Sequence, residues 1–313
     1  MTDVRGTFVD ISTADGTADA YFTHPDDGAQ HPGVLLYMDA FGLRPHLNAM
    51  ADRLAAAGYA VLVPNVFYRH GRTPVVDLPE FIDPGERPEI FEKILPVLQS
   101  LTPDQIRRDA DAYLGHLAES AQVTDGPVGI TGYCMGAALA LRTAASRPDR
   151  VAAAAGFHGG GLATDSEDSP HTVAGQVRAE LYFGHADQDH ALPPEQIERL
   201  DKVLTEAGVQ FRAEVYSGAP HGYTRPTPPT TTRKPPSGTG RSCWTCSAAP
   251  SEGRFPGRER GPARRARWSP PGGRSAGFAR NAGCPSRGRS RCWGGPLGRT
   301  AGADVGWRAA GER

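Results

Sequence analysis

Cys134 is the residue whose type and surroundings best fit a catalytic nucleophile. It stands between two glycines in the segment Gly132-Tyr133-Cys134-Met135-Gly136, which follows an apolar run at 128–131 and precedes a stretch rich in Ala and Leu. A strand, a tight turn and a helix in this order lift the central residue above a sheet at a helix N-terminus, where the partial positive charge favours a thiolate. Free cysteine is also a common core residue, but glycines on both sides in this context favour the catalytic interpretation.

A nucleophile in such a turn needs an acid and then a histidine later in the chain. His221 follows the last apolar segment in a Pro-His-Gly-Tyr sequence and is the expected general base. The acid is expected just past the apolar run that ends at Gly184, where Asp187 and Asp189 both occur. We prefer Asp187 because its G-x-x-D spacing places it nearest the strand end. Asp189 remains the alternative because of its spacing to Pro193.

The negative charge that develops on a substrate carbonyl oxygen needs backbone N–H donors. Met135, directly after the nucleophile, is the first expected donor, and the loop after the first buried strand supplies the second. Ala40 is our choice within that loop, with Phe41 as the neighbouring option. A His-Gly-Gly-Gly sequence begins at His158, but it follows the nucleophile instead of preceding it. We therefore interpret His158 as a pocket-wall or structural residue.

The hydrophobic pattern predicts the elements that would position these residues. Alternating apolar residues at 7–11 and 18–22 indicate an opening antiparallel hairpin. Continuous apolar runs then alternate with segments of helical length, which is typical of parallel strands buried on both faces. The sequence thus predicts an α/β fold of the α/β-hydrolase type, a mostly parallel sheet flanked by helices. The expected strands are 33–38, 60–64, 128–131, 151–156, 179–184 and 211–216, and the expected helices 46–57, 102–117 and 194–208, with further short helices within 66–96 walling the active site.

Composition excludes several classes of function. The formal net charge of -1 marks neither a nucleic-acid nor a membrane specialist. The first ten residues lack the pattern of a signal peptide, and no apolar run approaches the roughly 18 residues needed to span a bilayer. Cys134 is the only cysteine in the well-patterned part, which therefore holds no internal disulfide. We expect a cytoplasmic protein that needs no metal or organic cofactor.

Four segments together resemble the dienelactone hydrolase family over roughly residues 4–224. They are 132–136, Asp39 with Phe41-Gly42, the Pro-Asn-Val-Phe-Tyr-Arg segment at 64–69, and Pro-His-Gly-Tyr at 220–223. The resemblance implies hydrolysis of a lactone or small carboxylic ester through an acyl-cysteine intermediate, with His221 activating water. A thioesterase or another acyl-transfer enzyme on the same residues is the nearest alternative.

The resemblance also implies a substrate-binding set of Asp39, Phe41 and Arg69. Asp39 matches a carboxylate that interacts with the cysteine in the resting enzymes of the family, although the usual residue there is the longer glutamate. Arg69 matches one of two arginines that bind a substrate carboxylate. Arg225 has the spacing of the second arginine, but it lies where the well-patterned sequence ends, and we take its match as accidental.

The sequence changes character after Thr224. From Arg225 onward Arg, Gly, Pro, Ser and Thr dominate, which predicts a hydrolase domain over 1–224 and a disordered tail over 225–313. Members of this fold end with an amphipathic helix after the histidine loop, and the tail has none. GC-rich codons for 225–248, read one nucleotide out of frame, can give ADTPDYDAEAAERHWPELLDLLSR, which has apolar residues at helical spacing. We hypothesise that a frameshift near Thr224 replaced the native terminal helix.

A nucleic-acid-binding tail is the alternative from another functional class. The basic segment 264–267 could neutralise phosphates, and Cys243 and Cys246 could hold zinc. However, Cys284 and Cys292 lack a second C-x-x-C spacing, and the tail has no regular RGG repeats. We therefore favour a small-molecule lactone or ester as the partner of this chain over a nucleic acid.

Overall fold

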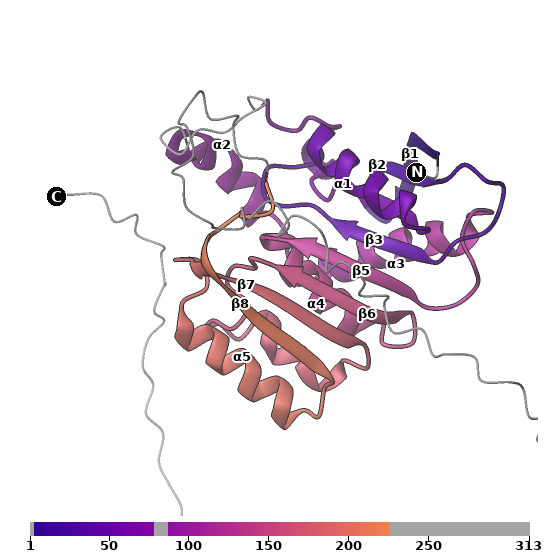
Figure 1. Cartoon of the computed structure of the whole chain (residues 1–313). Helices are drawn as coiled ribbons and strands as arrows, with labels where there is room; N and C mark the ends of the chain where they lie inside the picture. The colour runs from indigo at the N-terminus through magenta and orange to yellow at the C-terminus, as the bar shows by residue number, and fades with distance from the viewer. Residues whose placement is uncertain (1–2, 78–86, 226–313) are drawn as a thin grey trace, which may run out of the picture. The chain divides into compact units, whose positions relative to one another are not determined.

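A computed structural model describes residues 3–77 and 87–225, and these form an eight-stranded sheet in the order β1-β2-β4-β3-β5-β6-β7-β8 (Figure 1). The first two strands form the predicted antiparallel hairpin, and β2 also pairs with β4 in antiparallel fashion. All other neighbouring strands are parallel, as the continuous apolar runs predict. The strands are β1 (Val4–Thr13), β2 (Gly16–Pro25), β3 (Gly33–Tyr37), β4 (Ala60–Pro64), β5 (Val128–Tyr133), β6 (Val151–Phe157), β7 (Glu180–Gln188) and β8 (Phe211–Pro220).

The central strands are buried because helices cover both faces of the sheet there. Every residue of β3 and β4 is buried, which explains their unbroken apolar sequence. The helices are α1 (Pro45–Ala56), α2 (Arg87–Gln99), α3 (Pro103–Glu119), α4 (Met135–Ser146) and α5 (Pro194–Glu206), with short 3-10 helices η1 (Tyr68–His70) and η2 (Pro170–Gln176). A capping box starts α3, since the Thr102 hydroxyl accepts from the Gln105 N–H while the Gln105 side chain accepts from the Thr102 N–H.

The two faces of the sheet carry different helices. On one face the Tyr21 hydroxyl donates to Asp52 of α1 at 2.9 Å, and we name this the α1 face. On the other, Tyr37 lies edge-on to Tyr113 of α3, and its hydroxyl is 2.8 Å from that of Thr143 in α4. We name this the α4 face. Because the strands are parallel from β4 to β8, their carboxyl ends meet at one edge, where the loops that carry chemistry come together.

The long connection after β4 contains η1 and α2, as expected. Ile90 and Ile94 of α2 pack against Ala40 and Phe41 in the loop after β3, so α2 walls one side of the carboxyl edge. No helix in the described part of the chain is long and apolar enough to cross a membrane. The expectations for 226–313, which include the disordered tail, the zinc site and the nucleic-acid alternative, lie outside the described residues.

Candidate active site

Cys134 lies in a strained turn between β5 and α4. Its backbone adopts φ 56° and ψ -118°, a region that costs a non-glycine residue about 1–3 kcal/mol and persists only where the surroundings impose it. The Cys134 N–H donates to the Phe157 carbonyl oxygen at 3.0 Å, which ties the turn to the end of β6. Helix α4 begins with the next residue, Met135, so the side chain of Cys134 stands at a helix N-terminus.

The flanking glycines let three segments of backbone approach closely. A Cβ atom on Gly132 would lie 2.0 Å from the Gly136 carbonyl oxygen. A Cβ on Gly136 would lie 2.7 Å from the carbonyl oxygens of both Tyr37 and Met38 at the end of β3. No L side chain fits either position without moving the backbone. The glycines therefore allow β5, α4 and the loop after β3 to meet around Cys134.

A histidine and a carboxylate complete a line of hydrogen bonds from Cys134. The Nε2 atom of His221 is 3.1 Å from the Cys134 Sγ, and its Nδ1 atom is 2.8 Å from the Asp189 Oδ2. Asp189 follows β7 and His221 follows β8, so neighbouring parallel strands deliver both residues to the same edge of the sheet. Nucleophilic acyl transfer requires a nucleophile, a base and an acid in this arrangement, so these three residues are the candidate triad.

The electrostatics of this line favour a protonated His221. Burial alone lowers the pKa of His221, but its hydrogen bonds to Asp189 and Cys134 outweigh burial and raise this pKa to about 10. Burial also acts to raise the pKa of Asp189, whereas the hydrogen bond with His221 lowers it below its usual value. At neutral pH the imidazolium therefore lies between a carboxylate and the sulfur. It is the counter-charge that a thiolate needs.

The family of the chain follows from comparison with known proteins. The sequence model of the dienelactone hydrolase family matches residues 18–238, more than half of the chain. The chain belongs to this family. Membership makes it a hydrolase that acts on ester or lactone bonds.

The relatives of the family that match include bacterial proteins named for one reaction. A putative carboxymethylenebutenolidase of Synechocystis sp. is 26% identical over 224 residues, covering 71% of this chain and 87% of the relative. The carboxymethylenebutenolidase of Rhodococcus opacus is 26% identical over 216 residues, covering 67% and 79%. The crystal structure of a putative dienelactone hydrolase from Klebsiella pneumoniae has a TM-score of 0.61 at 22% identity, covering 71% of this chain and 89% of that one. This last likeness supports the α/β-hydrolase fold.

The structure brings a different aspartate to His221 from the one preferred on the sequence. Asp189, and not Asp187, is hydrogen-bonded to His221. Asp187 is exposed, and its Oδ2 accepts from the Gly218 N–H at 2.8 Å. The preference for Asp187 is wrong because β7 continues to Gln188, four residues beyond the predicted end, so Asp187 still lies within the strand. The other oxygen of Asp189 accepts from the Ala191 N–H at 2.9 Å, which fixes the carboxylate beyond the strand.

The loop after β3 distinguishes the two candidates for the second oxyanion donor. The Phe41 N–H donates to the Asp39 Oδ1 at 3.0 Å and is not available to a substrate. Ala40 therefore remains the predicted donor from this loop. Met135 is the first residue of α4, where a helix has no internal acceptor for its N–H, and it remains the other predicted donor.

Asp39, expected to bind the substrate, has partners within the protein. Its carboxylate is buried and forms a two-pronged ion pair with Arg44, at 2.6 Å and 2.8 Å. Together with the Phe41 N–H, this pair occupies both oxygens. Arg44 precedes α1 by one residue and follows Asp39 by five, so the nearby opposite charge was the signal in the sequence that the assignment missed.

Arg69 is also engaged elsewhere, contrary to expectation. Its guanidinium donates to both oxygens of Asp109 in α3 at 2.8 Å each, and to Asp15 in the opening hairpin at 2.6 Å. It also stacks over the Tyr68 ring at 4.4 Å. Arg69 therefore joins the hairpin to α3, and its charge is matched by two carboxylates instead of a substrate.

Arg225 and Phe41 lie together at the edge of the site. The guanidinium of Arg225 stands over the Phe41 ring at 4.8 Å and donates to the His221 carbonyl oxygen at 3.3 Å. Phe41 is mostly buried and packs edge-on against Phe91 of α2, with ring centroids 5.6 Å apart. Phe41 remains a predicted substrate contact. Arg225, whose match to the family we interpret as accidental from the sequence, brings a positive charge close to His221.

His158 contacts the loop that carries His221. Its side chain is buried, its Nε2 is 2.7 Å from the Thr224 hydroxyl, and its ring lies edge-on to that of His221 at 5.2 Å. Burial, and then the positive charge of His221, lower the pKa of His158 to about 3. A neutral His158 thus holds the end of the described chain close to His221. The expectation of a wall or structural residue fits this position.

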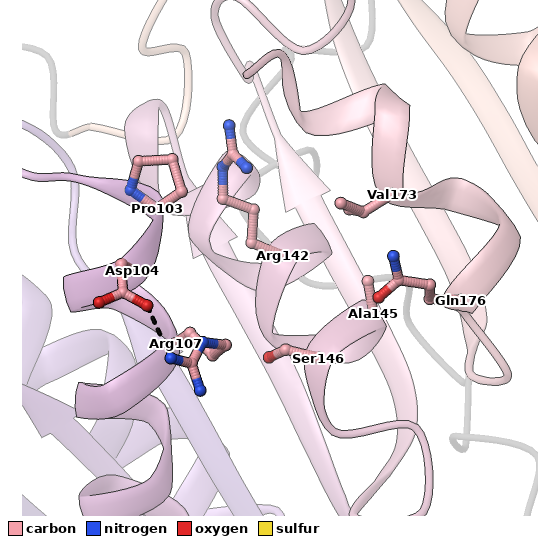
Figure 2. A pocket seen from close by; sticks show the side chains of 8 residues that line it. All are labelled: Pro103, Asp104, Arg107, Arg142, Ala145, Ser146, Val173 and Gln176. Carbon is pink, nitrogen blue, oxygen red and sulfur yellow. Dashed lines mark hydrogen bonds and ion pairs between the residues drawn. The ribbon is translucent and has the colours of Figure 1, made fainter. Parts of the chain in front are cut away.

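A separate cavity of about 290 Å³ lies between α3, α4 and η2 and contains no member of the triad (Figure 2). Its two arginines are already engaged, since Arg107 pairs with Asp104 at 2.6 Å and Arg142 donates to the Asp168 carbonyl oxygen. This cavity is therefore separate from the site around Cys134. Its lining residues are Pro103, Asp104, Arg107, Arg142, Ala145, Ser146, Val173 and Gln176.

Proposed function

We propose that the chain hydrolyses a lactone or small carboxylic ester through an acyl-cysteine intermediate. The observation that carries the proposal is the continuous line from Sγ through the imidazole to a carboxylate, with spacings of 3.1 Å and 2.8 Å. A cysteine that takes no part in catalysis would not need a strained turn, a buried acid and a histidine at hydrogen-bonding distance. The role of each residue follows from the atoms it presents.

In the first half of the reaction the Cys134 thiolate attacks the substrate carbonyl carbon. A carbon–sulfur bond forms, and the oxygen takes up negative charge that the N–H groups of Met135 and Ala40 stabilise. The carbon–oxygen bond of the ester or lactone then breaks. The leaving oxygen receives the proton from the Nε2 of His221, which leaves a neutral imidazole and a thioester on Cys134.

In the second half neutral His221 takes a proton from water. The resulting hydroxide adds to the thioester carbonyl carbon, the carbon–sulfur bond breaks, and the acid product leaves. The pair of thiolate and imidazolium is restored, with Asp189 holding the ring so that Nε2 faces the sulfur throughout. No redox partner enters either half of the cycle.

The substrate class follows from the nucleophile and from the charge at the site. A thiolate is a better leaving group than an alkoxide, so attack on an ordinary alkyl ester tends to reverse. A substrate whose leaving oxygen becomes a stabilised enolate or phenolate avoids this reversal. We further propose that a substrate carboxylate binds the Arg225 guanidinium beside Phe41 in exchange for the contacts that this guanidinium makes in the structure, which favours a lactone or ester that also bears a carboxylate.

A panel of substrates tests this proposal. We expect hydrolysis of enol lactones and aryl esters at rates well above those of alkyl esters with the same acyl group. Thioesters in the same panel detect the alternative activity, and preferential cleavage of thioesters would contradict the ester assignment. Cys134→Ala, measured alongside, should abolish turnover of every substrate, since it removes the nucleophile and leaves Asp189 and His221 in place.

A further inference from the structure

The cavity on the α4 face contains none of Cys134, Asp189 and His221. It lies over α4, between α3 and η2, which both pack against α4 (Figure 2). We name it the helix cavity. Arg142, one of its lining residues, is eight residues beyond Cys134 along the chain, or about 12 Å at 1.5 Å per residue of helix. A ligand in the helix cavity would therefore be held apart from the candidate triad.

The helix cavity has the size of a site for a small molecule. Its volume of about 290 Å³ is close to the lower end of the range for such sites, which is roughly 300–1,000 Å³. At about 30 Å³ for each water-sized group, it has room for roughly ten non-hydrogen atoms. Arg107 and Gln176 in its lining are exposed, so a ligand can enter from solvent. The dimensions suit a ligand that contains one substituted ring.

One part of the lining is apolar. Ala145 of α4 is buried, and Val173 of η2 packs against the main hydrophobic core. Pro103, the first residue of α3, adds a ring that has no backbone N–H to donate. These three side chains offer no hydrogen bond to a ligand. An apolar group placed against them would release water from both surfaces, which favours binding.

The polar part of the lining carries more positive than negative charge. It contains the guanidinium groups of Arg107 and Arg142 but a single carboxylate, that of Asp104. Asp104 pairs with Arg107 at 2.6 Å and also with Arg108, so its one negative charge is divided between two arginines. The lining therefore has an excess of one positive charge, which favours an anionic ligand.

Arg142 has a weaker counter-charge than Arg107 has. Its guanidinium donates to the backbone carbonyl oxygen of Asp168, which is neutral, and it forms no ion pair within the described part of the chain. Burial lowers the pKa of Arg142, and the nearby charge of Asp168 offsets this lowering only in part. Partly buried charges in proteins are normally paired, so an anion beside Arg142 would supply a missing partner.

Two neutral side chains can complete the binding of an anion. The Gln176 amide forms no hydrogen bond with another described residue, so its N–H groups are available to a ligand. The Ser146 hydroxyl donates to the Thr143 carbonyl oxygen at 3.3 Å, which is long for a hydroxyl donor, and it can exchange this acceptor for a better one. Helices η2 and α4 thus each add a neutral donor to the two arginines.

A carboxylate fits this charge better than a phosphate does. Planar guanidinium groups bind carboxylates through two parallel N–H···O bonds. A phosphate monoester carries about −1.5 to −2 charges near pH 7, whereas the excess in the lining is one positive charge. Asp104 would repel the additional negative charge of the phosphate. The ligand that matches both the charge and the apolar surface is therefore a monocarboxylate with an apolar body.

We propose that the helix cavity binds a small organic carboxylate with an aromatic or branched apolar body. The carboxylate pairs with Arg142 and accepts hydrogen bonds from Gln176 and Ser146. The apolar body packs on Ala145 and Val173. The site is independent of the proposed hydrolysis, because its lining contains no residue of the candidate triad.

Ligand-observed fluorine NMR with 4-fluorobenzoate measures this binding. The protein is the full chain carrying Arg225→Met, which removes the carboxylate contact proposed at the active site. We expect saturable binding with a Kd of about 1 mM or below. Arg142→Met in this background should weaken binding at least about tenfold. Arg212→Met, the same change at an exposed residue of β8, should leave the Kd unchanged. An absence of saturable binding, or equal binding in the Arg142→Met and Arg212→Met variants, would overturn the proposal.

Further arms of the experiment test the chemistry of the ligand and guard against misfolding. The amide 4-fluorobenzamide has the same shape without the charge and should not bind, and equal binding of the amide would exclude charge recognition. Inorganic phosphate should not displace the probe, and displacement would contradict the assignment to a carboxylate. Gln176→Trp fills the cavity from an exposed position and should also weaken binding at least about tenfold. It replaces Arg142→Met if circular dichroism shows that the latter does not fold.

Discussion

Replacing Asp189 and Asp187 one at a time tests which of the two carboxylates supports catalysis. Asp189→Asn keeps the shape of the side chain but removes the negative charge 2.8 Å from the His221 Nδ1. The rise in the pKa of His221 from 6.5 to about 10 corresponds to roughly 5 kcal/mol, to which Asp189 and Cys134 both contribute. If Asp189→Asn removes about 2 kcal/mol of this stabilisation of the protonated imidazole, the rate of hydrolysis falls roughly 30-fold. The wrong imidazole tautomer adds to the loss, as in serine triads.

Asp187→Asn is the matched control, with the same chemical change two residues away. Asp187 contacts only the Gly218 N–H among the hydrogen bonds of the described residues and is exposed, so we expect less than about a threefold change in kcat/KM. Initial rates with p-nitrophenyl acetate at neutral pH measure both variants, and circular dichroism confirms their folding. Full activity in Asp189→Asn together with a large loss in Asp187→Asn would refute the assignment of the acid.

Three further substitutions test separate parts of the account. Gly136→Ala forces a Cβ to within 2.7 Å of two carbonyl oxygens, so it should lower the melting midpoint by several degrees; unchanged melting would contradict the close approach. The folded-state pKa of His158, about 3, lies below that of an unfolded histidine, so this residue costs stability as pH falls below 6.5. Urea unfolding should show that the free energy of unfolding falls by about 2 kcal/mol between pH 7 and pH 5. This fall should be absent in His158→Gln. Arg225→Met should raise KM about tenfold for carboxylate-bearing lactones and leave neutral esters unaffected; equal changes for both would exclude a role in charge recognition.

The sequence could predict that Cys134 and His221 lie together because the position of each depends on a local pattern. The turn around Cys134 needs glycines on either side, and these are visible in the sequence without any tertiary information. The parallel strands are equally visible, since burial on both faces requires unbroken apolar runs such as that of β3. His221 follows the last predicted strand, 211–216, and a histidine placed there can reach the carboxyl edge.

The errors arose where the outcome depends on an element boundary or on a distant partner. Asp187 was preferred over Asp189 because no residue after Gly184 marks where β7 ends, and the strand continues to Gln188. Arg69 was assigned to a substrate because its partner Asp109 is forty residues away and reaches it only through the packing of α3. Counter-charges supplied by tertiary contacts leave no periodic signal in a sequence.

The positions of His158 and Arg225 needed the folded chain. Among non-glycine residues of the described part, His158 shares a positive φ only with Cys134, and neither its burial nor its contact with Thr224 follows from its neighbours in sequence. Arg225 looked like the first residue of an unrelated tail. Its contact with Phe41 depends on the path of the histidine loop over α1 and the loop after β3.

The central claim is that the sulfur of Cys134 carries the acyl group between the two halves of the reaction. Acid quenching during the first turnover of p-nitrophenyl acetate, followed by peptide mapping with mass spectrometry, measures this directly. We predict one acetyl group on the peptide that contains Cys134, and none in Cys134→Ala. A full turnover with that peptide unmodified, or an acetyl group that accumulates on another residue, would contradict it.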